Sequence, residues 1–521
     1  MVQVVIVGGG PVGLLLATEV ASGGIETTVL ERLTAVDRTI KAGAINQPTA
    51  EILDRRGLWP AVEAAQAESR RRFDEFVRAA MQQRGLDADA LKDTPRPRIL
   101  GHFGGIMLDA ARYDAAHPEA AGRHPGRSGG MVSQQQVEQM LGERAERLGV
   151  RVLRGVEFES FDQDADGVTV RCADGSVLRA DWLVGCDGGR SRVRKLAGFA
   201  FPGTDPEITA YQAVAEMSGH EALEPGWHAT PVGVYVHGPM PGRILVARFD
   251  GVPVDREAPI GEAELQEAIR HVTGAEVSVH AITSATRFTD NARQVPAYRA
   301  GRVLLAGDAA HVHSPFGGQG LNLGLGDAAN LGWKLAAVCR GEAGEALLDT
   351  YTAERHPIGA WVLDWTRAQI AVMRPDPQAR AIRALLTDLA ATGDGTTHLV
   401  NRISGVWQRY DLGGGHPLVG ASAPELAFAD GTRLADHLHA GKALLLDPAK
   451  ALAPAAEGYR GRLVVLHQPV EGDAPAAALL VRPDGYVAWA SDAALEAADA
   501  AGLTAALGAW LGAPDPAVAA G

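Results

Sequence analysis

The pattern of apolar and polar positions divides the chain into parallel α/β pieces and one antiparallel block. Val4–Val7 is a short apolar run, Pro11–Ser22 has helical composition and residues 27–30 form a second apolar run, which together predict a βαβ unit. Residues 210–284 instead alternate between apolar and polar positions, most clearly in Gly233–His237, as in an antiparallel sheet. Because parallel pieces lie on both sides of this block, we expect one domain to be assembled from discontinuous segments.

The remaining apolar patterns predict further helices and a small C-terminal domain. Helical patterns cover residues 49–64, 134–148 and 320–339. Residues 68–130 are polar with little periodicity, which predicts a helix followed by a long and partly irregular segment. From about Gly413 the chain becomes rich in Gly, Ala and Pro, as in a small separate domain. Short apolar runs predict strands of that domain at 443–446, 463–467, 477–481 and 486–489.

A glycine-rich turn joins the first predicted strand to the first predicted helix. The sequence GGGPVG at 8–13 satisfies the GxGxxG pattern. Gly8 allows the tight turn, Gly10 lets the backbone approach a pyrophosphate, and Gly13 lets the helix pack on the strand. The pyrophosphate then meets free N–H groups at the positive end of the helix. Glu31 closes the second strand, 18 residues after Gly13, where it can accept hydrogen bonds from an adenosine ribose. These features predict a dinucleotide site.

A second glycine-rich turn distinguishes a flavin site from a nicotinamide site. A buried strand predicted at 303–306 runs into Gly-Asp, and GGQGLN at 317–322 opens the next helix. Asp308 can hydrogen-bond a polyol such as a ribityl chain, and the helix that begins near Gly320 points its N–H groups at whatever lies there. A reduced flavin carries negative charge at N1 and C2=O, which this geometry stabilises, whereas NAD has no group that needs it. The alternative is an ordinary strand–turn–helix that uses small residues for packing.

Composition and charge exclude several other classes of protein. The 521 residues include 49 Lys and Arg against 63 Asp and Glu, a net charge of -14, which argues against nucleic acid as the main partner. No apolar run approaches the roughly 18–20 residues that span a bilayer, and the N-terminus lacks the basic region and cleavage site of a signal peptide. The three cysteines, Cys172, Cys186 and Cys339, form no CxxC pair, so we expect neither disulfides nor a metal site. We therefore expect a cytoplasmic protein without a membrane or nucleic-acid partner.

Three motifs in combination resemble those of the FAD-dependent aromatic hydroxylases. They are GGGPVG followed by Glu31-Arg32, GCDGGRSRVRK at 185–195, and GDAAHVHSPFGGQGLNLGLGDAANLGWKLA at 307–336. Over essentially its whole length, the chain is similar to the flavoprotein monooxygenases of p-hydroxybenzoate hydroxylase type. It resembles more closely the aromatic polyketide hydroxylases of angucycline and anthracycline biosynthesis. That closer resemblance rests on GHFGGIMLD at 101–109, NARQV at 291–295, TYTAERHPIG at 350–359 and VRPDGYVAWA at 481–490.

The resemblance implies an α/β protein with three parts. These are an FAD-binding Rossmann-like domain of p-hydroxybenzoate hydroxylase type, an antiparallel-sheet substrate domain, and a C-terminal thioredoxin-like domain that lacks redox cysteines. We expect residues 1–70, 131–200 and 285–395 in the FAD-binding domain, 71–130 and 201–284 in the middle domain, and 410–521 in the C-terminal domain.

The resemblance also assigns roles to individual residues. Gln134 would contact the FAD chain, and Asp187 lies in a motif linked to both FAD and NADPH binding. Pro315 would sit over the flavin ring near the oxygen site, while Leu321 and Asn322 would give backbone N–H groups to the flavin pyrimidine, so these three are the candidate catalytic residues. The full set of expected cofactor contacts is Gly8, Gly10, Pro11, Gly13, Glu31, Arg32, Lys41, Gln134, Asp187, Asp308, Pro315, Gly318, Gly320, Leu321 and Asn322.

Some residues depart from the family pattern or favour a structural role. Lys41 stands where the family usually has arginine. Two roles stay open for it, a contact with the flavin and an ordinary surface position. Pro48 stands where polyketide hydroxylases often have a second arginine, which weakens any inference about substrate orientation from that position. His311 and His313 are more typical of structural hydrogen bonding than of a catalytic base, and Cys186 is expected to be a packed thiol.

The activity that the resemblance implies is oxygen transfer. Hydride passes from NADPH or NADH to non-covalently bound FAD, O₂ is captured as a C4a-(hydro)peroxyflavin, and one oxygen atom is transferred to a polycyclic aromatic polyketide in natural-product biosynthesis. The chain has no second GxGxxG between a strand and a helix, so the nicotinamide is expected to bind transiently. We expect a monomer or a homodimer.

Two alternatives stay open from the sequence. The same fold can perform a Baeyer–Villiger-type oxygen insertion or an oxidative ring rearrangement on a similar polyketide. The chain can also be a redox-silent protein that binds flavin or an aromatic metabolite. Disulfide reduction is disfavoured because no CxxC accompanies the predicted flavin site, and the WxWxIP signature of flavin halogenases is missing.

Overall fold

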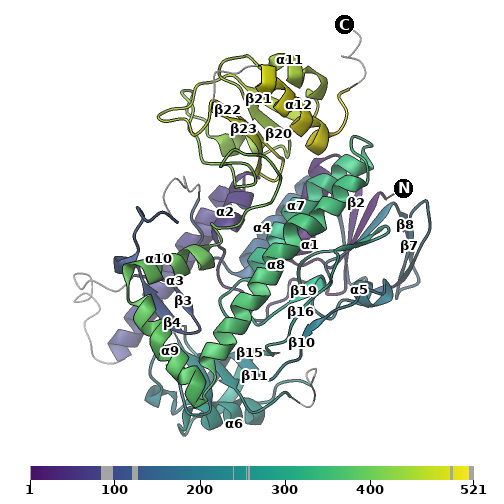
Figure 1. The fold of residues 1–521 in the computed structure, drawn as a ribbon. Helices are drawn as coiled ribbons and strands as arrows, with labels where there is room; N and C mark the ends of the chain where they lie inside the picture. Colours follow the sequence, from purple (N-terminus) through teal and green to yellow (C-terminus); the bar gives the residue numbers. More distant parts are fainter. Residues whose placement is uncertain are drawn as a thin grey trace.

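The protein has a C-terminal domain at one end, an antiparallel sheet at the other, and a parallel sheet between them (Figure 1). The computed structural model describes residues 2–83, 98–119, 127–238, 240–253, 255, 258–492 and 497–515. The long helix α8 (Ala346–Met373) runs from the parallel sheet toward the antiparallel one (Figure 1). None of the described helices is long and apolar enough to cross a membrane.

The central element of the first part is a six-stranded sheet that is parallel except for one edge strand. Its order is β17 (Arg299–Ala300), β18 (Val303–Leu305), β9 (Trp182–Gly185), β1 (Val4–Val7), β2 (Thr27–Glu31) and β5 (Arg151–Arg154). The four residues of β1 are all buried between β2 and β9, as expected for a parallel strand covered on both faces. The predicted βαβ unit is confirmed.

Helices from distant parts of the sequence cover this sheet. α1 (Pro11–Ser22) connects β1 to β2 and packs against both α4 (Gln134–Arg147) and α7 (Gly320–Cys339). α4 and α7 confirm the helices that the periodicity predicted there. The smaller elements around them are α5 (Arg192–Leu196), the sheet of β6 (Phe158–Gln163), β7 (Val168–Cys172) and β8 (Val177–Ala180), and the sheet of β10 (Gly203–Thr204), β16 (Ala292–Gln294) and β19 (His311–Val312).

The alternating block of the sequence forms a five-stranded antiparallel sheet, as predicted. Its order is β12 (Gly226–Ala229), β13 (Gly233–His237), β14 (Arg243–Arg248), β11 (Thr209–Ser218) and β15 (Ser278–Phe288). Tyr211 and Ala213 face the amphipathic helix α6 (Glu262–Thr273), whereas Ala210 faces the opposite side, where Phe316 and Met373 pack. The period of two therefore separates a helix-covered face from a face turned toward the rest of the molecule.

The polar stretch from 68 to 130 contains a hairpin that the sequence pattern did not reveal. Helix α2 (Gln47–Asp54) ends before Gly57, whose φ is +71°, and α3 (Trp59–Gln83) begins after it. The hairpin consists of β3 (Ile99–Phe103) and β4 (Ile106–Asp109). It packs through Phe103 and Ile106 against α8 and near two further helices, α9 (Pro377–Ala390) and α10 (Gly393–Ser404). Parts of the predicted irregular segment, at 84–97 and 120–126, lie outside the described residues.

The C-terminal domain is built on a four-stranded mixed sheet. Its order is β21 (Leu463–Leu466), β20 (Ala443–Leu446), β22 (Ala478–Val481) and β23 (Val487–Ser491). β20 pairs in parallel with β21 and antiparallel with β22. One face packs against α11 (Ala453–Ala456) and α12 (Ala497–Leu511). All four strands predicted from the sequence are present, shifted by two residues or fewer.

Candidate flavin site

The glycine-rich turn between β1 and α1 is shaped by close packing at two of its glycines. A Cβ on Gly8, whose φ is +112°, would lie 2.2 Å from the Cys186 carbonyl oxygen. A Cβ on Gly13 would lie 2.0 Å from the Gly8 carbonyl oxygen. Gly10, at the N-cap of α1, has no atom within 4 Å of its Cβ position, so space is left open at the first turn of the helix. The turn has the tight bend, the packing contact and the open approach that a pyrophosphate requires.

The N-termini of α1 and α7 have neither a side-chain cap nor an acidic residue in the first turn. They share this property with α3, which follows Leu58. Six other helices have caps from Asn46, Ser133, Asp376 and Thr392 or first-turn acids Glu262, Glu264 and Asp349. First-turn N–H groups without intrahelical partners, together with the helix dipole, attract negative charge. Both ends therefore fit the anionic parts of FAD.

These two helix ends lie side by side. A Cβ on Gly324 of α7 would lie 2.6 Å from Cγ2 of Val12, and a Cβ on Gly307 would lie 3.1 Å from the same atom. Because Gly307 has a φ of +61°, it turns the chain after β18 and places the exposed Asp308 at the surface of this junction. A Cβ on Gly320 would lie 4.0 Å from Oδ1 of Asp308, so the carboxylate stands beside the first turn of α7. The two predicted cofactor motifs thus form one site.

A buried carboxylate holds the turn that carries Asp308. Asp327 of α7 accepts hydrogen bonds from the Gly307 N–H (3.1 Å), from Nε2 of His311 (2.7 Å) and from Nε of Arg355 (2.8 Å). Burial alone would raise the pKa of Asp327, but the neighbouring His311 and Arg355 outweigh it and keep that pKa below its usual value. His311 is a structural hydrogen-bonding residue, as the sequence favoured.

The acid at the end of β2 is already held in place. One carboxylate oxygen of Glu31 accepts from the Gly9 N–H at 2.7 Å and the other from the Leu33 N–H at 2.8 Å. It therefore stands beside the glycine-rich turn, where a ribose hydroxyl could also donate to it. Arg32 is exposed next to it. Burial raises the pKa of the Cys186 thiol, which is consistent with a packed, protonated cysteine behind the turn.

The ring-side loop, residues 313–319 before α7, carries the residues that the resemblance places beside the flavin ring. Pro315 is exposed and Phe316 is buried, and Gly318 has a φ of +64° with no atom within 4 Å of its Cβ position. The side chain of Asn322 accepts from the Asn46 N–H at 2.8 Å and donates to the Gly318 carbonyl at 2.9 Å. Its amide is thus used to hold the loop, which leaves the backbone N–H groups of Leu321 and Asn322 as the free donors at this end.

Three of the expected contacts have local partners in the structure. The Asp187 carboxylate accepts from the hydroxyl of Ser191 and from the N–H groups of Arg192 (2.7 Å) and Val193, so it fixes the turn into α5. Gln134 is the first residue of α4, and its N–H donates to the Ala42 carbonyl at 2.9 Å. Lys41 forms an ion pair with Asp37 at 2.7 Å. These contacts neither require nor exclude FAD.

Two residues that hold the site were missed in the sequence analysis. They are Asp327 and Arg355, which lie in the two quoted motifs GLGDAAN and TAERHPIG. The available signal was a row of polar residues, Asp327, Asn330 and Lys334, on one stripe of an otherwise apolar helix. Polar side chains in a buried helix need partners, and the partners come from α8.

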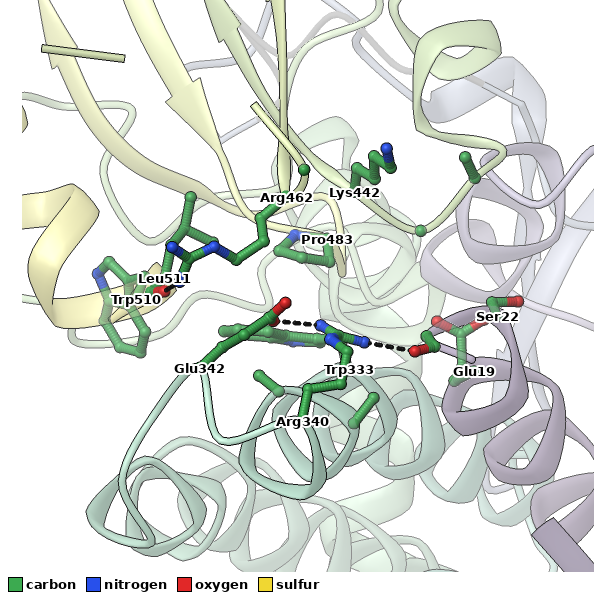
Figure 2. A pocket seen from close by; sticks show the side chains of 16 residues that line it. Glu19, Ser22, Trp333, Arg340, Glu342, Lys442, Arg462, Pro483, Trp510 and Leu511 are labelled. Carbon is green, nitrogen blue, oxygen red and sulfur yellow. Dashed lines mark hydrogen bonds and ion pairs between the residues drawn. The ribbon is translucent and has the colours of Figure 1, made fainter. Parts of the chain in front are cut away.

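A cavity of about 210 Å³ lies elsewhere, between the FAD-binding part and the C-terminal domain (Figure 2). Trp333 of α7 and Arg340, the residue that follows this helix, line one side, and Lys442, Arg462 and Trp510 line the other. At 1.5 Å per residue, Trp333 and Arg340 are about 20 to 30 Å from the N-terminus of α7. The cavity is therefore separate from the flavin site.

The comparisons with known proteins place the chain among FAD-binding proteins. The family model for an FAD binding domain matches residues 1–366, and the model for the C-terminal domain of aromatic-ring hydroxylases matches residues 416–514. A 12-dehydrotetracycline 5-monooxygenase/anhydrotetracycline 6-monooxygenase of Streptomyces rimosus is 39% identical over 540 residues, covering 98% of this chain and 99% of the relative. A dialkyldecalin synthase of Streptomyces rugosporus is 36% identical over 526 residues, covering 98% of each.

A solved structure shows the same architecture. The anhydrotetracycline hydroxylase from Streptomyces rimosus superposes with a TM-score of 0.83 at 37% identity, covering 98% of this chain and 99% of that one. The predicted fold class and cofactor are confirmed by these matches. The chain belongs to the FAD-dependent aromatic monooxygenases, with an FAD binding domain followed by an aromatic-ring hydroxylase C-terminal domain.

Proposed function

We propose that this protein uses NADPH or NADH and O₂ to transfer one oxygen atom to a polycyclic aromatic polyketide, in the cytoplasm and as a monomer or homodimer. The observation that carries the proposal is the junction of two uncapped helix N-termini beside the exposed Asp308. The kinship to a tetracycline-pathway monooxygenase supports the substrate class.

Different residues of the chain would bind the parts of FAD and stabilise charge on its ring. When bound, FAD supplies the redox chemistry, namely hydride acceptance and activation of O₂. The open space at Gly10 and the first-turn N–H groups of α1 would bind its pyrophosphate, and Glu31 its adenosine ribose. Asp308 would orient the ribityl chain, and the N–H groups of Leu321 and Asn322 would stabilise negative charge on the pyrimidine side of the ring. Pro315 and Phe316 would shield the reacting face from water.

The direct test is turnover with a defined aromatic probe. Protein loaded with FAD is mixed with NADPH and anhydrotetracycline, and NADPH oxidation is followed together with the product mass. We expect the probe to accelerate NADPH oxidation and the product to gain one oxygen atom. NADPH oxidation that yields only hydrogen peroxide across a panel of tricyclic and tetracyclic phenols would contradict the proposal.

Two other outcomes can be told apart from hydroxylation. A Baeyer–Villiger-type insertion gives the same mass gain, so the product structure, ring-hydroxylated or ring-expanded, separates it from hydroxylation. The kinship to a Diels-Alderase of pyrroindomycin biosynthesis, 34% identical with a TM-score of 0.77, supports a redox-silent activity as the second candidate, because a Diels–Alder cycloaddition consumes neither reductant nor O₂. In that case the protein would convert its substrate without NADPH or O₂, which an anaerobic incubation without reductant detects.

A further inference from the structure

The tip of the β3–β4 hairpin is a tight two-residue turn. Gly104 and Gly105 have φ values of +53° and +80°, the left-handed conformation that both central residues of such a turn need. Phe103 and Ile106 pack against α8 on one face of the hairpin. His102 pairs in register with the exposed Met107, so both side chains lie on the opposite, partly open face.

One buried side chain joins this hairpin to the loop that carries Pro315. Oε1 of Gln369, which is 0% exposed, accepts from the Gly104 N–H at 3.0 Å. Its Nε2 donates to the Phe316 carbonyl at 3.3 Å. Arg383 of α9 donates to the Gly104 carbonyl from the other side. The hairpin tip therefore has a fixed position next to the ring-side loop of the flavin site.

A row of aromatic rings leads from that loop to His102. The centroid of Phe316 is 5.6 Å from that of Phe288 and 5.9 Å from that of Trp227. The centroid of Trp227, on the edge strand β12, is 4.4 Å from the imidazole of His102. Side chains from the hairpin, the antiparallel sheet and the ring-side loop thus form one aromatic wall. Phe316 is buried in it, whereas Trp227 and His102 are half-buried, so these two present the surface that a flat polycyclic molecule can contact.

The hydrogen bonding of His102 defines which of its nitrogens can act on a ligand. Nδ1 accepts from the Gly105 N–H at 3.3 Å, so in the neutral ring the proton is on Nε2. Burial and the charge of Arg383 lower the pKa of His102 to about 4, which keeps the ring neutral near pH 7. Nε2 makes no hydrogen bond to any of the described residues. A neutral N–H donor is therefore available at the end of the aromatic wall.

We propose that His102 is a substrate-binding residue, whose Nε2–H donates a hydrogen bond to a keto or phenolic oxygen of a planar polycyclic substrate that packs against Trp227. The inference rests on the proposed function, because it assumes that the substrate lies between the hairpin and the ring-side loop. It adds a fixed polar contact to a wall that is otherwise apolar, and such a contact selects the orientation of a flat ligand.

Two substitutions separate the donor from the ring. His102→Phe keeps an aromatic ring and removes the donor, whereas His102→Gln restores a donor and can still accept from the Gly105 N–H. The FAD-loaded proteins are titrated with anhydrotetracycline without NADPH, and binding is read from the change in flavin absorbance. We expect His102→Phe to raise the Kd about three- to ten-fold, as for loss of one hydrogen bond. We expect His102→Gln to recover most of the affinity.

The control is His280→Phe, the same change at an exposed histidine near the far end of β15. We expect it to leave the Kd unchanged, and product formed per NADPH should fall only in His102→Phe. Equal Kd values in wild type and His102→Phe would overturn the inference, as would a Kd in His102→Gln as high as that in His102→Phe. If wild type neither binds nor oxidises any polycyclic phenol, the proposed function itself fails, which is distinct from a wild type that turns over and ignores His102.

Discussion

The two ends of helix α7 are built for opposite purposes. Its first turn follows Gly317 and Gly318, has no side-chain cap and stands beside the exposed Asp308. Its second half holds Asn330 and Lys334, both 0% exposed, in a network that the protein completes by itself. One helix thus leaves backbone N–H groups free at the flavin end and pairs the charged and amide side chains of its other end.

The buried end also joins the C-terminal domain to the rest of the chain. Lys334 of α7 lies 2.9 Å from Glu354 of α8. Arg482, from the turn between β22 and β23, lies 2.8 Å from Glu354 and also pairs with Asp484. Two cations and two carboxylates therefore balance inside the interface. Removing one member of such a group leaves an unpaired buried charge, whereas the flavin end carries no such penalty.

The largest effect is expected from breaking the buried end. Arg482→Met should lower the free energy of unfolding by about 3–5 kcal/mol, because Glu354 and Asp484 lose their shared cation. Urea unfolding measures this. The control Arg460→Met removes a surface pair with Glu457 and should cost less than about 0.5 kcal/mol. The Kd for FAD of the folded variant should stay within two-fold of wild type; a large rise would show that the two ends are coupled.

A smaller effect, opposite in kind, is expected at the open end. Asp308→Ala should weaken FAD binding about ten- to hundred-fold, as for loss of hydrogen bonds to a charged group. The stability of the apoprotein should not change, because the side chain is exposed. Flavin fluorescence on titration gives the Kd, and Asp394→Ala on exposed α10 is the matched control. A variant that binds FAD as tightly as wild type would remove Asp308 from the site.

The smallest effect is expected in the pH dependence of stability, which reports on Lys334 at the buried end of α7. Burial lowers the pKa of Lys334 to about 7 despite the nearby Glu354, whereas an unfolded lysine titrates near 10.4. Between these values the unfolded chain binds more protons, so the destabilisation by the buried cation is fully present below pH 7 and is relieved as pH rises, which raises the free energy of unfolding from pH 7 to pH 8. Lys334→Met should lack a rise of about 1 kcal/mol over that range, measured by urea unfolding at each pH. Parallel pH curves for variant and wild type would contradict it.

Most features that depend on residues close together in the sequence could be predicted, and features that depend on distant residues could not. The strand β1 and the whole of α7 follow from apolar runs and periodicity within a few residues, and both are confirmed. The β3–β4 hairpin was missed because its strands are short and lie in a polar stretch, with only the Gly104-Gly105 pair to mark the turn. The Arg482 network was missed because its partner Glu354 lies 128 residues away.

The candidate site divides in the same way. The glycine-rich turns were predictable, since the chemistry needs small residues at fixed spacing and the structure has them there. The local partners of Lys41 and Asp187 were not, because an ion pair with Asp37 and a cap on α5 depend on how loops fold back. The family-based roles of these residues in FAD binding stay predictions.

The shared charges at Arg482 bear on how such enzymes can be recombined. A C-terminal domain transplanted from a relative with an apolar residue at this position would leave Glu354 of the recipient with Lys334 as its only cation among the described residues, and the donor's counterpart of Asp484 without Arg482. In a successful chimaera, the residues of α7 and α8 that belong to this charge network therefore come from the same parent protein as the C-terminal domain. The unit to exchange is therefore the C-terminal domain together with the sides of α7 and α8 that face it. A crossover near Gly413 would separate these parts.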